Sequence, residues 1–337
     1  MSKGYNVAVV GATGAVGEEM LRILEERRFP FGNLRVMASE KSEGRALRFC
    51  GENLKVERLS SSSFQGVEIA LFSAGAEISK EFSPQAVKKG SVVVDNSSAF
   101  RMESGVPLVV PEVNPDALKS HQGIIANPNC STIQLVVAIN PLHQITPIKR
   151  LVISTYQAVS GTGREAIEEL KSQIQQWLKG EEIKKEVYPH QIAFNLLPHI
   201  GEFLTNGYTE EELKLVNETK KIMKDDRMAV TATCVRVPVF VSHCEAVTVE
   251  MEKELSVNQV KKILSRAPGV ILQDNSAHLY PLPLEAAGKD EVFVGRIRKD
   301  ESIKNGVNLW IVADNLRKGA ALNTIQIAEL LIKQSLL

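Results

Sequence analysis

The chain has 337 residues, of which 44% are hydrophobic and 24% charged, a composition typical of a globular protein long enough for two domains. Lysine plus arginine equals aspartate plus glutamate at 40 each, so no overall charge favours nucleic acid or a membrane surface. No apolar run approaches the roughly 20 residues that cross a bilayer, and the start of the chain has no signal-peptide pattern. We therefore expect a cytoplasmic protein whose four cysteines, which lack CxxC spacing, stay reduced and form no metal site.

The first part of the sequence alternates short apolar strands with helices. Helices are predicted at residues 16–27 and 78–89, and Pro84 should make the second one irregular at its centre. Strands are predicted at 6–10, 34–38, 67–72, 91–95 and 123–126. Short buried strands that alternate with helices favour an α/β fold with a parallel, doubly wound sheet.

The second part has longer predicted strands, at residues 150–156, 229–237, 245–252, 292–298 and 307–313. Residues 245–251 alternate in polarity, as in a sheet with one wetter face. Amphipathic helices are predicted at 164–178 and 210–223. This pattern indicates an α+β domain with a mostly antiparallel or mixed sheet. A last apolar helix, 320–336, is expected to pack back on the first domain.

A glycine-rich turn links the first predicted strand to the first predicted helix. Residues 11–17 read GATGAVG, with glycines at every third position. Such glycines let the backbone approach a pyrophosphate, whose charge the amides of the helix N-terminus bind. The spacing is GxxGxxG rather than the common GxGxxG, and a tight turn without a ligand would read the same. The flanking strand and helix favour dinucleotide binding.

The end of the second predicted strand should distinguish NAD from NADP. An acidic residue there binds the ribose 2′-hydroxyl, whereas basic and hydroxyl side chains accommodate a 2′-phosphate. Lys41 and Ser42, with Arg45 nearby, suit the phosphate, and Glu40 would oppose it if it pointed inward. A solvated charged loop is the alternative. We predict NADP.

The segment NPNCSTIQ, residues 127–134, carries the most informative chemical signal. Pro128 forces an extended approach, and Cys130 then opens an apolar run that should be helical. A thiol at a helix N-terminus lies at the positive end of the helix dipole, which favours the nucleophilic thiolate. Together with a nicotinamide cofactor, it indicates oxidation of an aldehyde through a thioester. A cysteine is also often a small buried hydrophobe, and Cys50, Cys234 and Cys244 fit that interpretation better.

Further polar residues could assemble around this cysteine. Gln157 follows a predicted strand and can orient a carbonyl without taking a proton. The loop 160–163, SGTG, precedes a helix and forms a second possible anion cradle. His243 lies between two predicted strands, and histidine is the natural proton acceptor near neutral pH. A lone histidine is more often structural, and Arg101 and Arg236 could be surface residues, so the prediction depends on the combination.

These segments, in this order and over essentially the full length, resemble those of the bacterial aspartate-β-semialdehyde dehydrogenases. The matching motifs are GATGAVG (11–17), DNSSAFR (95–101), VPEVN (110–114), NPNCSTIQ (127–134), YQAVSGTG (156–163), RVPVFVSH (236–243) and ADNLRKGAAL (313–322). The resemblance implies a Rossmann-type NADP-binding domain, residues 1–127 and 316–337. It also implies a catalytic and dimerisation domain, residues 128–315, which would form at least a homodimer.

The resemblance also implies a role for each matching residue. Cys130 would be the nucleophile that forms the acyl-thioester, His243 the proton acceptor, and Gln157 would position the substrate. Arg236 would pair with the α-carboxylate of aspartate semialdehyde, and Glu211 would hold its ammonium group. Inorganic phosphate would bind Arg101, Asn129 and Lys214. NADP would contact Gly11, Thr13, Gly14, Ala15, Val16, Lys41, Ser42, Ser160, Gly161 and Asn315.

Two features leave alternatives open. Glu218 and Lys221 repeat the spacing of Glu211 and Lys214 on the same predicted helix, so either pair could face the site. Glu40 and Lys41 stand where the family usually has a basic residue followed by arginine, which leaves the strictness of NADP over NAD open.

The implied reaction is the NADP-dependent reductive dephosphorylation of L-aspartyl 4-phosphate to L-aspartate 4-semialdehyde. This step belongs to lysine (diaminopimelate), threonine and methionine biosynthesis. One alternative is a related reductase, acting on N-acetylglutamyl phosphate or malonyl-CoA. The former usually has glycine where this chain has Asn129, and the latter would share most of the motifs. A second alternative is a non-catalytic nucleotide-binding paralogue, which need not keep Cys130, Gln157, Arg236 and His243 together.

Overall fold

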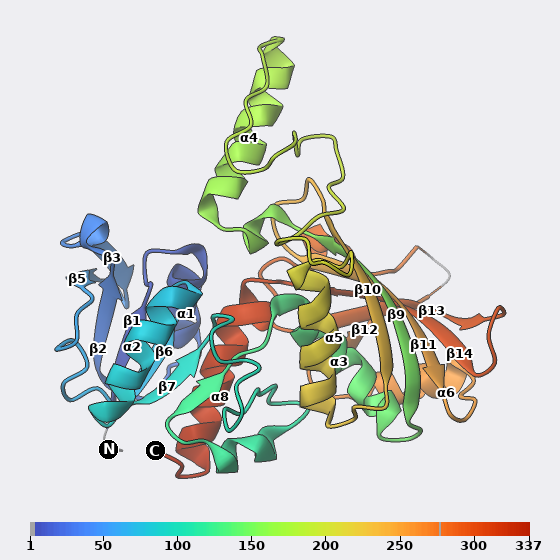
Figure 1. Ribbon diagram of the computed structural model, residues 1–337, viewed down its shortest axis with the longest axis horizontal. Helices are drawn as coiled ribbons and strands as arrows, with labels where there is room; N and C mark the ends of the chain where they lie inside the picture. The colour runs from blue at the N-terminus through green and yellow to red at the C-terminus, as the bar shows by residue number, and fades with distance from the viewer. Residues whose placement is uncertain (1–3, 276–277) are drawn as a thin grey trace. The chain divides into compact units, whose positions relative to one another are not determined.

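The computed structural model describes residues 4–275 and 278–337, and the chain divides into two compact units (Figure 1). Unit 1 comprises Met1–Asn129 and Ala320–Leu337, and unit 2 comprises Cys130–Gly319. No helix among the described residues is both long and apolar enough to cross a membrane. Each unit is built around its own six-stranded sheet.

Unit 1 contains a parallel sheet with the strand order β5-β2-β1-β6-β7-β8. Its strands are β1 (Tyr5–Val10), β2 (Phe31–Ala38), β5 (Glu57–Arg58), β6 (Ile69–Phe72), β7 (Val92–Asp95) and β8 (Ile124–Ala126). Its helices are α1 (Ala15–Glu26), α2 (Ala76–Lys88) and α8 (Leu322–Lys333). The predicted doubly wound fold is confirmed. The strand order reverses between β1 and β6, where such sheets bind ligands at the carboxyl ends of their strands.

Alternate residues of β1 face the two sides of this sheet, and both sides are buried. Val7 and Val9 join a core that includes Leu322 and Leu331 of α8, whereas Ala8 lies in a second core on the other side. The last helix therefore packs on the first domain, as its apolar composition predicts. Contrary to the expected irregularity, α2 runs without a break through Pro84.

A β-hairpin of unit 1 was not expected from the sequence. Its strands are β3 (Ala46–Phe49) and β4 (Glu52–Lys55), and its turn holds Cys50 and Gly51 with positive φ values of 49° and 81°. Cys50 is exposed, so its interpretation as a buried hydrophobe is wrong. In this register Leu47 and Phe49 point inward, and Cys50, the next residue, lies in the turn.

Unit 2 contains a mixed sheet with the order β10-β9-β11-β14-β13-β12. The β10–β9 and β12–β13 pairs are parallel and the others antiparallel, as predicted for a mixed sheet. The strands are β9 (Ile148–Gln157), β10 (Ala229–Arg236), β11 (His243–Met251), β12 (Val270–Leu272), β13 (Val292–Asp300) and β14 (Gly306–Ala313). Helices α6 (Val257–Leu264) and α7 (Pro283–Ala286), like β12, were not expected.

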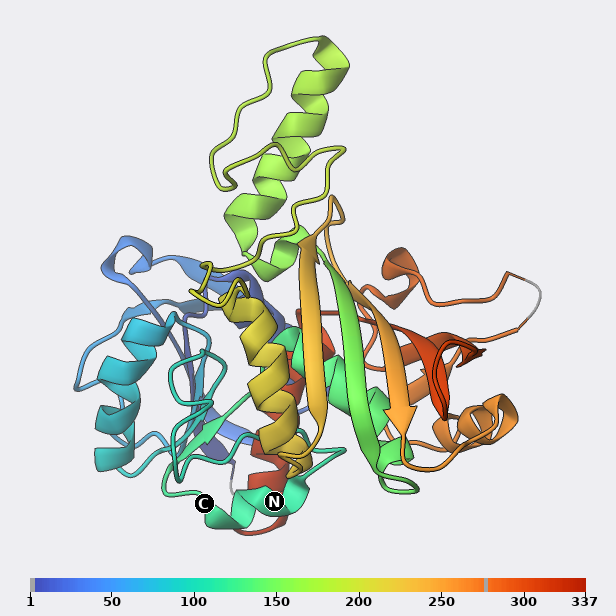
Figure 2. The ribbon, with the colours of Figure 1, turned by 45° about the vertical axis from the view of Figure 1, so that its right-hand side comes forward.

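Two helices pack against one face of the mixed sheet, α3 (Cys130–His143) and α5 (Glu210–Met223), as Figure 2 shows. Nearly every side chain of α3 is buried, which fits its apolar composition on all sides. A capping box between Thr209 and Glu212 starts α5, and the Glu212 carboxylate also accepts a hydrogen bond from the Cys234 backbone N–H at 3.0 Å. Helix α4 (Arg164–Lys179) instead projects away from the sheet (Figure 1).

Candidate active site

Three predicted site residues lie at the ends of neighbouring strands in unit 2. Arg236 ends β10, Gln157 ends β9 and pairs with it in register, and His243 begins β11. Since Cys244 pairs with Tyr156, the antiparallel register of β11 places His243 beside Gln157. All three side chains are at least 95% buried, so neither arginine nor histidine here is a surface residue.

His243 is fully buried and held by the main chain. Its Nδ1 accepts a hydrogen bond from the Ala158 N–H at 3.1 Å, and its Nε2 has no partner among the described residues. Burial lowers the pKa of His243 to about 3, and the charge of Arg236 adds to this decrease. The imidazole is therefore neutral near pH 7, and with Nδ1 as acceptor it carries its proton on Nε2.

Arg236 is anchored to the same backbone position. Its Nη1 donates to the Ala158 carbonyl at 2.7 Å, and its Nε has no partner among the described residues. Gly161 lies directly against both groups, because a Cβ there would come within 2.9 Å of Arg236 Nη1 and 3.1 Å of His243 Nε2. This absence of a side chain brings the guanidinium and the imidazole beside one another. A buried guanidinium with an unused donor is suited to a carboxylate ligand.

A chain of polar contacts joins Gln157 to helix α5. The Gln157 Nε2 donates to Glu211 at 3.1 Å and to the Thr155 hydroxyl at 3.3 Å. The other Glu211 carboxylate oxygen lies 3.3 Å from Lys214 Nζ. Glu211 thus contacts both Gln157 and Lys214. Glu218 lies two helical turns further along α5.

Cys130 is the first residue of α3, as predicted, and is partly exposed. The π-helix Arg317–Ala321 passes close to it, since a Cβ on Gly319 would lie 2.9 Å from the Cys130 Cβ and 3.3 Å from its Cα. A single π-helical turn is rare and often marks a functional site. Here the π-helix places Gly319, which has no side chain, against Cys130.

The predicted cofactor residues of unit 2 form a hydrogen-bonded group. The Asn315 amide oxygen accepts from the Ser160 hydroxyl at 3.1 Å and from the Ser242 N–H at 2.9 Å. Ser160 and Gly161 belong to a short 3₁₀ turn, Val159–Gly161, that precedes α4. Asn315 thus ties this turn to the residue before His243.

The glycine-rich turn of unit 1 has the geometry of a dinucleotide site. Gly11 has a φ of 82°, and a Cβ on Gly17 would lie 2.2 Å from the Gly11 carbonyl, so the helix and strand approach too closely for any side chain. Gly14 precedes the first residue of α1, Ala15, and no side chain caps that helix. The amides in the turn with Thr13, Ala15 and Val16 therefore fit a pyrophosphate.

The segment that should bind the 2′-phosphate follows β2. Lys41 and Ser42 lie in a 3₁₀ turn, Glu40–Ser42, and the Ser42 hydroxyl is 3.4 Å from that of Thr13. The Glu40 carboxylate accepts a hydrogen bond from Arg58 at 3.1 Å. Arg58 ends β5, where it pairs in register with Ala38 at the end of β2. Arg58, which is distant from Glu40 in the sequence, thus partly offsets the negative charge of Glu40 that would oppose the 2′-phosphate of NADP.

Two of the predicted phosphate ligands, Arg101 and Asn129, are buried in unit 1. The Arg101 guanidinium donates to the backbone carbonyls of Asn127 at 2.9 Å and Asn96 at 3.0 Å. Burial raises the pKa of the neighbouring Asp95 carboxyl. Hydrogen bonds from Ser97 and Ser79 and the positive charge of Arg101 partly offset this increase. The third predicted ligand, Lys214, belongs to unit 2.

Several residues around the site were not identified from the sequence. Ala158 acts through its backbone and Gly319 through its missing side chain, so neither has a chemical signature. Glu245, a buried carboxyl two residues after His243, carries a signal in retrospect, because it is an acidic residue on an otherwise apolar strand face. Cys234 and Cys244 are buried, and burial raises the pKa of the Cys244 thiol to about 12.

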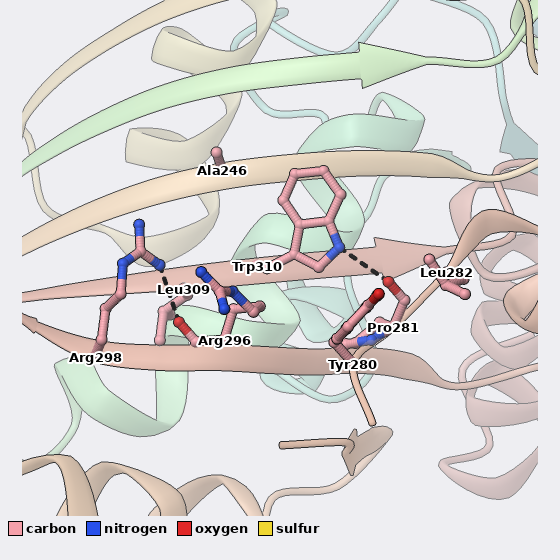
Figure 3. Close-up of a pocket in the computed structure, with 8 residues that line it drawn as sticks. All are labelled: Ala246, Tyr280, Pro281, Leu282, Arg296, Arg298, Leu309 and Trp310. Atoms are coloured by element: carbon pink, nitrogen blue, oxygen red, sulfur yellow. Dashed lines mark hydrogen bonds between the residues drawn. The ribbon is translucent and has the colours of Figure 1, made fainter. Parts of the chain in front are cut away.

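A separate pocket of about 470 Å³ lies in unit 2 (Figure 3). Trp310 and Ala246 pair in register, and Ala246 points to the face of β11 opposite His243. The Trp310 indole donates to the Pro281 carbonyl at 3.0 Å. Leu282 and Tyr280 extend the apolar surface. This pocket is therefore distinct from the residues around His243.

Comparisons with known proteins agree with this architecture. Residues 6–121 match the family model described as the NAD binding domain of semialdehyde dehydrogenase, and residues 139–318 match its dimerisation domain. The aspartate-semialdehyde dehydrogenase of Aquifex aeolicus is 56% identical over 99% of this chain and 100% of that enzyme. The chain belongs to the aspartate-semialdehyde dehydrogenase family. It is thus an oxidoreductase with a nicotinamide-nucleotide-binding domain.

Other members of the aspartate-semialdehyde dehydrogenase family extend the match. The Bacillus subtilis enzyme is 52% identical over all of both chains. The crystal structure of aspartate semialdehyde dehydrogenase II from Vibrio cholerae complexed with ASA has a TM-score of 0.96 and 48% identity, covering 98% of this chain and 99% of that one. A structure from Candida albicans with NADP is more distant, with 25% identity, a TM-score of 0.77 and coverage of 99% and 100%.

The close approach of Gly319 to Cys130 leads to a testable prediction. The substitution G319A should displace the thiol, because a methyl group forced into a packed site costs about 1–3 kcal/mol or moves its neighbours. We expect kcat with aspartate semialdehyde to fall about tenfold, since about 1.4 kcal/mol in the barrier corresponds to that factor. The affinity for the nicotinamide nucleotide, measured by fluorescence titration, should be unchanged. An unaltered kcat would show that the close approach does not set the position of Cys130.

Proposed function

We propose that this protein catalyses the reversible, NADP-dependent conversion of L-aspartyl 4-phosphate to L-aspartate 4-semialdehyde through a thioester on Cys130. The main support is the alignment of Arg236, Gln157 and His243 at adjoining strand ends in a chain 56% identical to an aspartate-semialdehyde dehydrogenase. Unit 1 would bind NADP, and unit 2 would carry the catalytic residues. The step would serve lysine, threonine and methionine biosynthesis, and the cytoplasmic location remains a prediction.

In the oxidative direction, the Cys130 thiolate adds to the aldehyde carbon, and the carbonyl oxygen becomes an alkoxide. NADP supplies the hydride acceptor when it is bound. Loss of hydride from the same carbon restores the carbonyl group and leaves a thioester. A phosphate oxygen then attacks the thioester carbon and expels the thiolate, which gives the acyl phosphate. The covalent intermediate separates hydride transfer from phosphorylation.

His243 would act on the oxygen that becomes negative. In the arrangement described above its neutral ring carries a proton on Nε2, which can donate to the alkoxide as the thiolate adds. The role expected from the sequence, acceptance of a proton from the thiohemiacetal, requires the unprotonated form of Nε2. The ring would then have to give up the hydrogen bond from Ala158. Both roles use the same atom, and we propose that His243 serves the substrate oxygen through it.

Charge complementarity supports the proposed recognition of an amino acid. Arg236 can bind a carboxylate with its remaining donors, and Glu211 can accept a hydrogen bond from an ammonium group. Gln157 contacts Glu211 and could orient the substrate carbonyl. Arg101, Asn129 and Lys214 would bind phosphate, as the sequence resemblance implies.

We further propose that NADP is the preferred cofactor. Lys41 and Ser42 offer a cation and a hydroxyl, and Arg58 pairs with the opposing carboxylate of Glu40. The remaining cofactor contacts would come from Gly11 and the turn around Gly14, and from Ser160, Gly161 and Asn315. The more distant relative with NADP in its structure agrees with this choice.

The thioester mechanism predicts the behaviour of C130A. Removing the sulfur removes the nucleophile, so turnover should fall below about one part in a thousand. NADP binding, measured by fluorescence titration, should stay near the wild-type value. Turnover is followed at the nicotinamide absorbance with aspartate semialdehyde and phosphate. Normal turnover by C130A would contradict the mechanism, and wild-type activity only with coenzyme A would favour an acyl-CoA reductase.

The ion pair between Arg58 and Glu40 predicts a change in cofactor preference. In R58Q the Glu40 carboxylate loses its partner and should repel a 2′-phosphate, so kcat/KM for NADP should fall about three- to fivefold, since the pair is exposed to solvent. The value for NAD should change less than about twofold, because NAD lacks that phosphate. The matched control R48Q removes an exposed arginine of unit 1 and should alter neither value. Equal losses with both cofactors would contradict the proposed role.

We propose that the enzyme is a homodimer through the face of the mixed sheet that carries Ala246 and Trp310. This face exposes apolar side chains, among them Leu282 and Leu284, in the unit matched by the family's dimerisation domain. The substitution A246R should place an unpaired charge in the interface and reduce the sedimentation mass to that of a monomer. The control E52R, on an exposed strand of unit 1, should sediment like the wild type. An A246R protein that remains dimeric would exclude this face.

A further inference from the structure

Glu245 is a buried carboxyl group for which the proposed reaction has no use. It lies on β11 two residues after His243, so both side chains point to the same face of the sheet. The side chain is fully buried, and neither carboxyl oxygen has a hydrogen-bond partner among the described residues. Buried polar atoms are almost always hydrogen bonded, so this arrangement calls for a physical explanation.

The surroundings of Glu245 form a layer beneath the candidate active site. In register it pairs with Thr155 on β9 and Ile311 on β14, and Thr155 in turn pairs with Cys234 on β10. This row is two residues below the row of Arg236, Gln157 and His243. Helix α5 contributes the carboxylate of Glu211, and α3 contributes Gln134. Among the described residues, the thiols of Cys234 and Cys244 also interact electrostatically with Glu245, and His243 lies two residues away on the same strand.

The state of this carboxyl follows from burial. Burial raises the pKa of Glu245 well above its ordinary value, and the negative charge of Glu211 raises it further, while the nearby Gln134 amide opposes the rise. Burial and the charge of Glu211 thus both favour the neutral carboxylic acid over the carboxylate. A neutral acid has one O–H donor and one carbonyl acceptor.

This donor and this acceptor are complementary to those of the Gln134 side-chain amide. That amide is also buried, and its Nε2 has no hydrogen-bond partner among the described residues. In an acid–amide pair the acid O–H donates to the amide oxygen, and the amide N–H donates to the acid carbonyl. Three of the four atoms that such a pair needs, both Glu245 oxygens and Gln134 Nε2, have no other hydrogen-bond partner in the described part of the chain.

Gln134 is four residues after Cys130, one helical turn along the same face of α3. We propose that Glu245 is a positioning residue, which pairs as a neutral acid with the Gln134 amide and so fixes the first turn of α3, and with it the Cys130 thiol. This inference rests on the proposed function in one respect, the use of Cys130 as the nucleophile. Glu245 itself would not touch the substrate.

Two substitutions separate hydrogen bonding from charge and bulk. E245Q keeps a neutral group with a donor and an acceptor, and we expect its kcat to stay within about threefold of the wild type. E245L keeps the bulk but cannot pair, and its kcat should fall about tenfold while the KM for NADP changes little. Q134L should match E245L, and the double variant should be no worse than either single one, because both lose the same interaction. The control E250L, further along β11 toward the surface, should behave as the wild type.

A direct readout of the thiol separates positioning from a general loss of stability. The rate at which iodoacetamide alkylates Cys130, measured by mass spectrometry without substrate across a range of pH, reports how readily the thiolate forms. We expect E245L and Q134L to shift this profile and E245Q to leave it in place. Because the measurement needs no turnover, it holds even if the proposed reaction is wrong, whereas failure of wild-type turnover with aspartate semialdehyde would refute only the function.

The protonation state has its own test, which still applies if E245L does not fold. A carboxyl whose pKa is raised by folding stabilises the protein below its ordinary pKa of 4.5, and this contribution is lost as the pH rises toward the folded value. The free energy of unfolding of E245Q relative to the wild type should therefore increase with pH above that point. An E245Q enzyme as impaired as E245L, an unimpaired E245L, or a pH-independent stability difference would each overturn the proposal.

Discussion

The register between β9, β10 and β11 is the constraint on which the candidate active site depends. Parallel pairing of β10 with β9 sets Arg236 beside Gln157, and antiparallel pairing of β11 with β9 brings His243 to the other side. A shift of one residue in either pairing would turn a side chain to the opposite face of the sheet. The buried apolar residues that follow on β11, Val247, Val249 and Met251, make such a shift costly, because they would leave the core with it.

The same face of the sheet holds polar groups that would be unfavourable in an ordinary core. Arg236 is about 95% buried and His243 is fully buried, and neither Arg236 Nε nor His243 Nε2 has a hydrogen-bond partner among the described residues. Burial of an incompletely paired charge destabilises a fold, and sites that bind charged substrates keep such groups nonetheless. The apolar helix α3 packs against this face and excludes water, which strengthens each remaining interaction.

Much of the architecture could be predicted from the sequence because its signals are local. The glycine spacing at residues 11–17, the apolar strands of the first part and the helix that begins at Cys130 are each written in consecutive residues. The hairpin around Cys50 was missed because its strands are only four residues long and its turn depends on a positive φ. Short strands with a charged outer face resemble loops in composition.

The parts of the site that could not be predicted depend on pairings between distant segments. Nothing near Glu40 in the sequence indicates that Arg58 lies beside it, since the contact arises from the pairing of β5 with β2. The contact between Gln157 and Glu211 likewise joins β9 to α5, two segments that are far apart in the sequence. The layer formed by Glu245 and Gln134 likewise exists only once α3 is packed on the sheet.

Ala158 illustrates how little of such a site needs to be encoded in side chains. Its amide holds the imidazole of His243 and its carbonyl holds the guanidinium of Arg236, so a single residue's main chain fixes the spacing of two functional groups. Its methyl group is fully buried, so a larger side chain would shift the backbone that carries both anchors, and proline would also delete the amide hydrogen. The side chain at such a position therefore acts through packing alone, whereas the position of the backbone determines both anchors. A change in substrate specificity would then require the backbone around residue 158 to move, rather than a substitution of Ala158 itself.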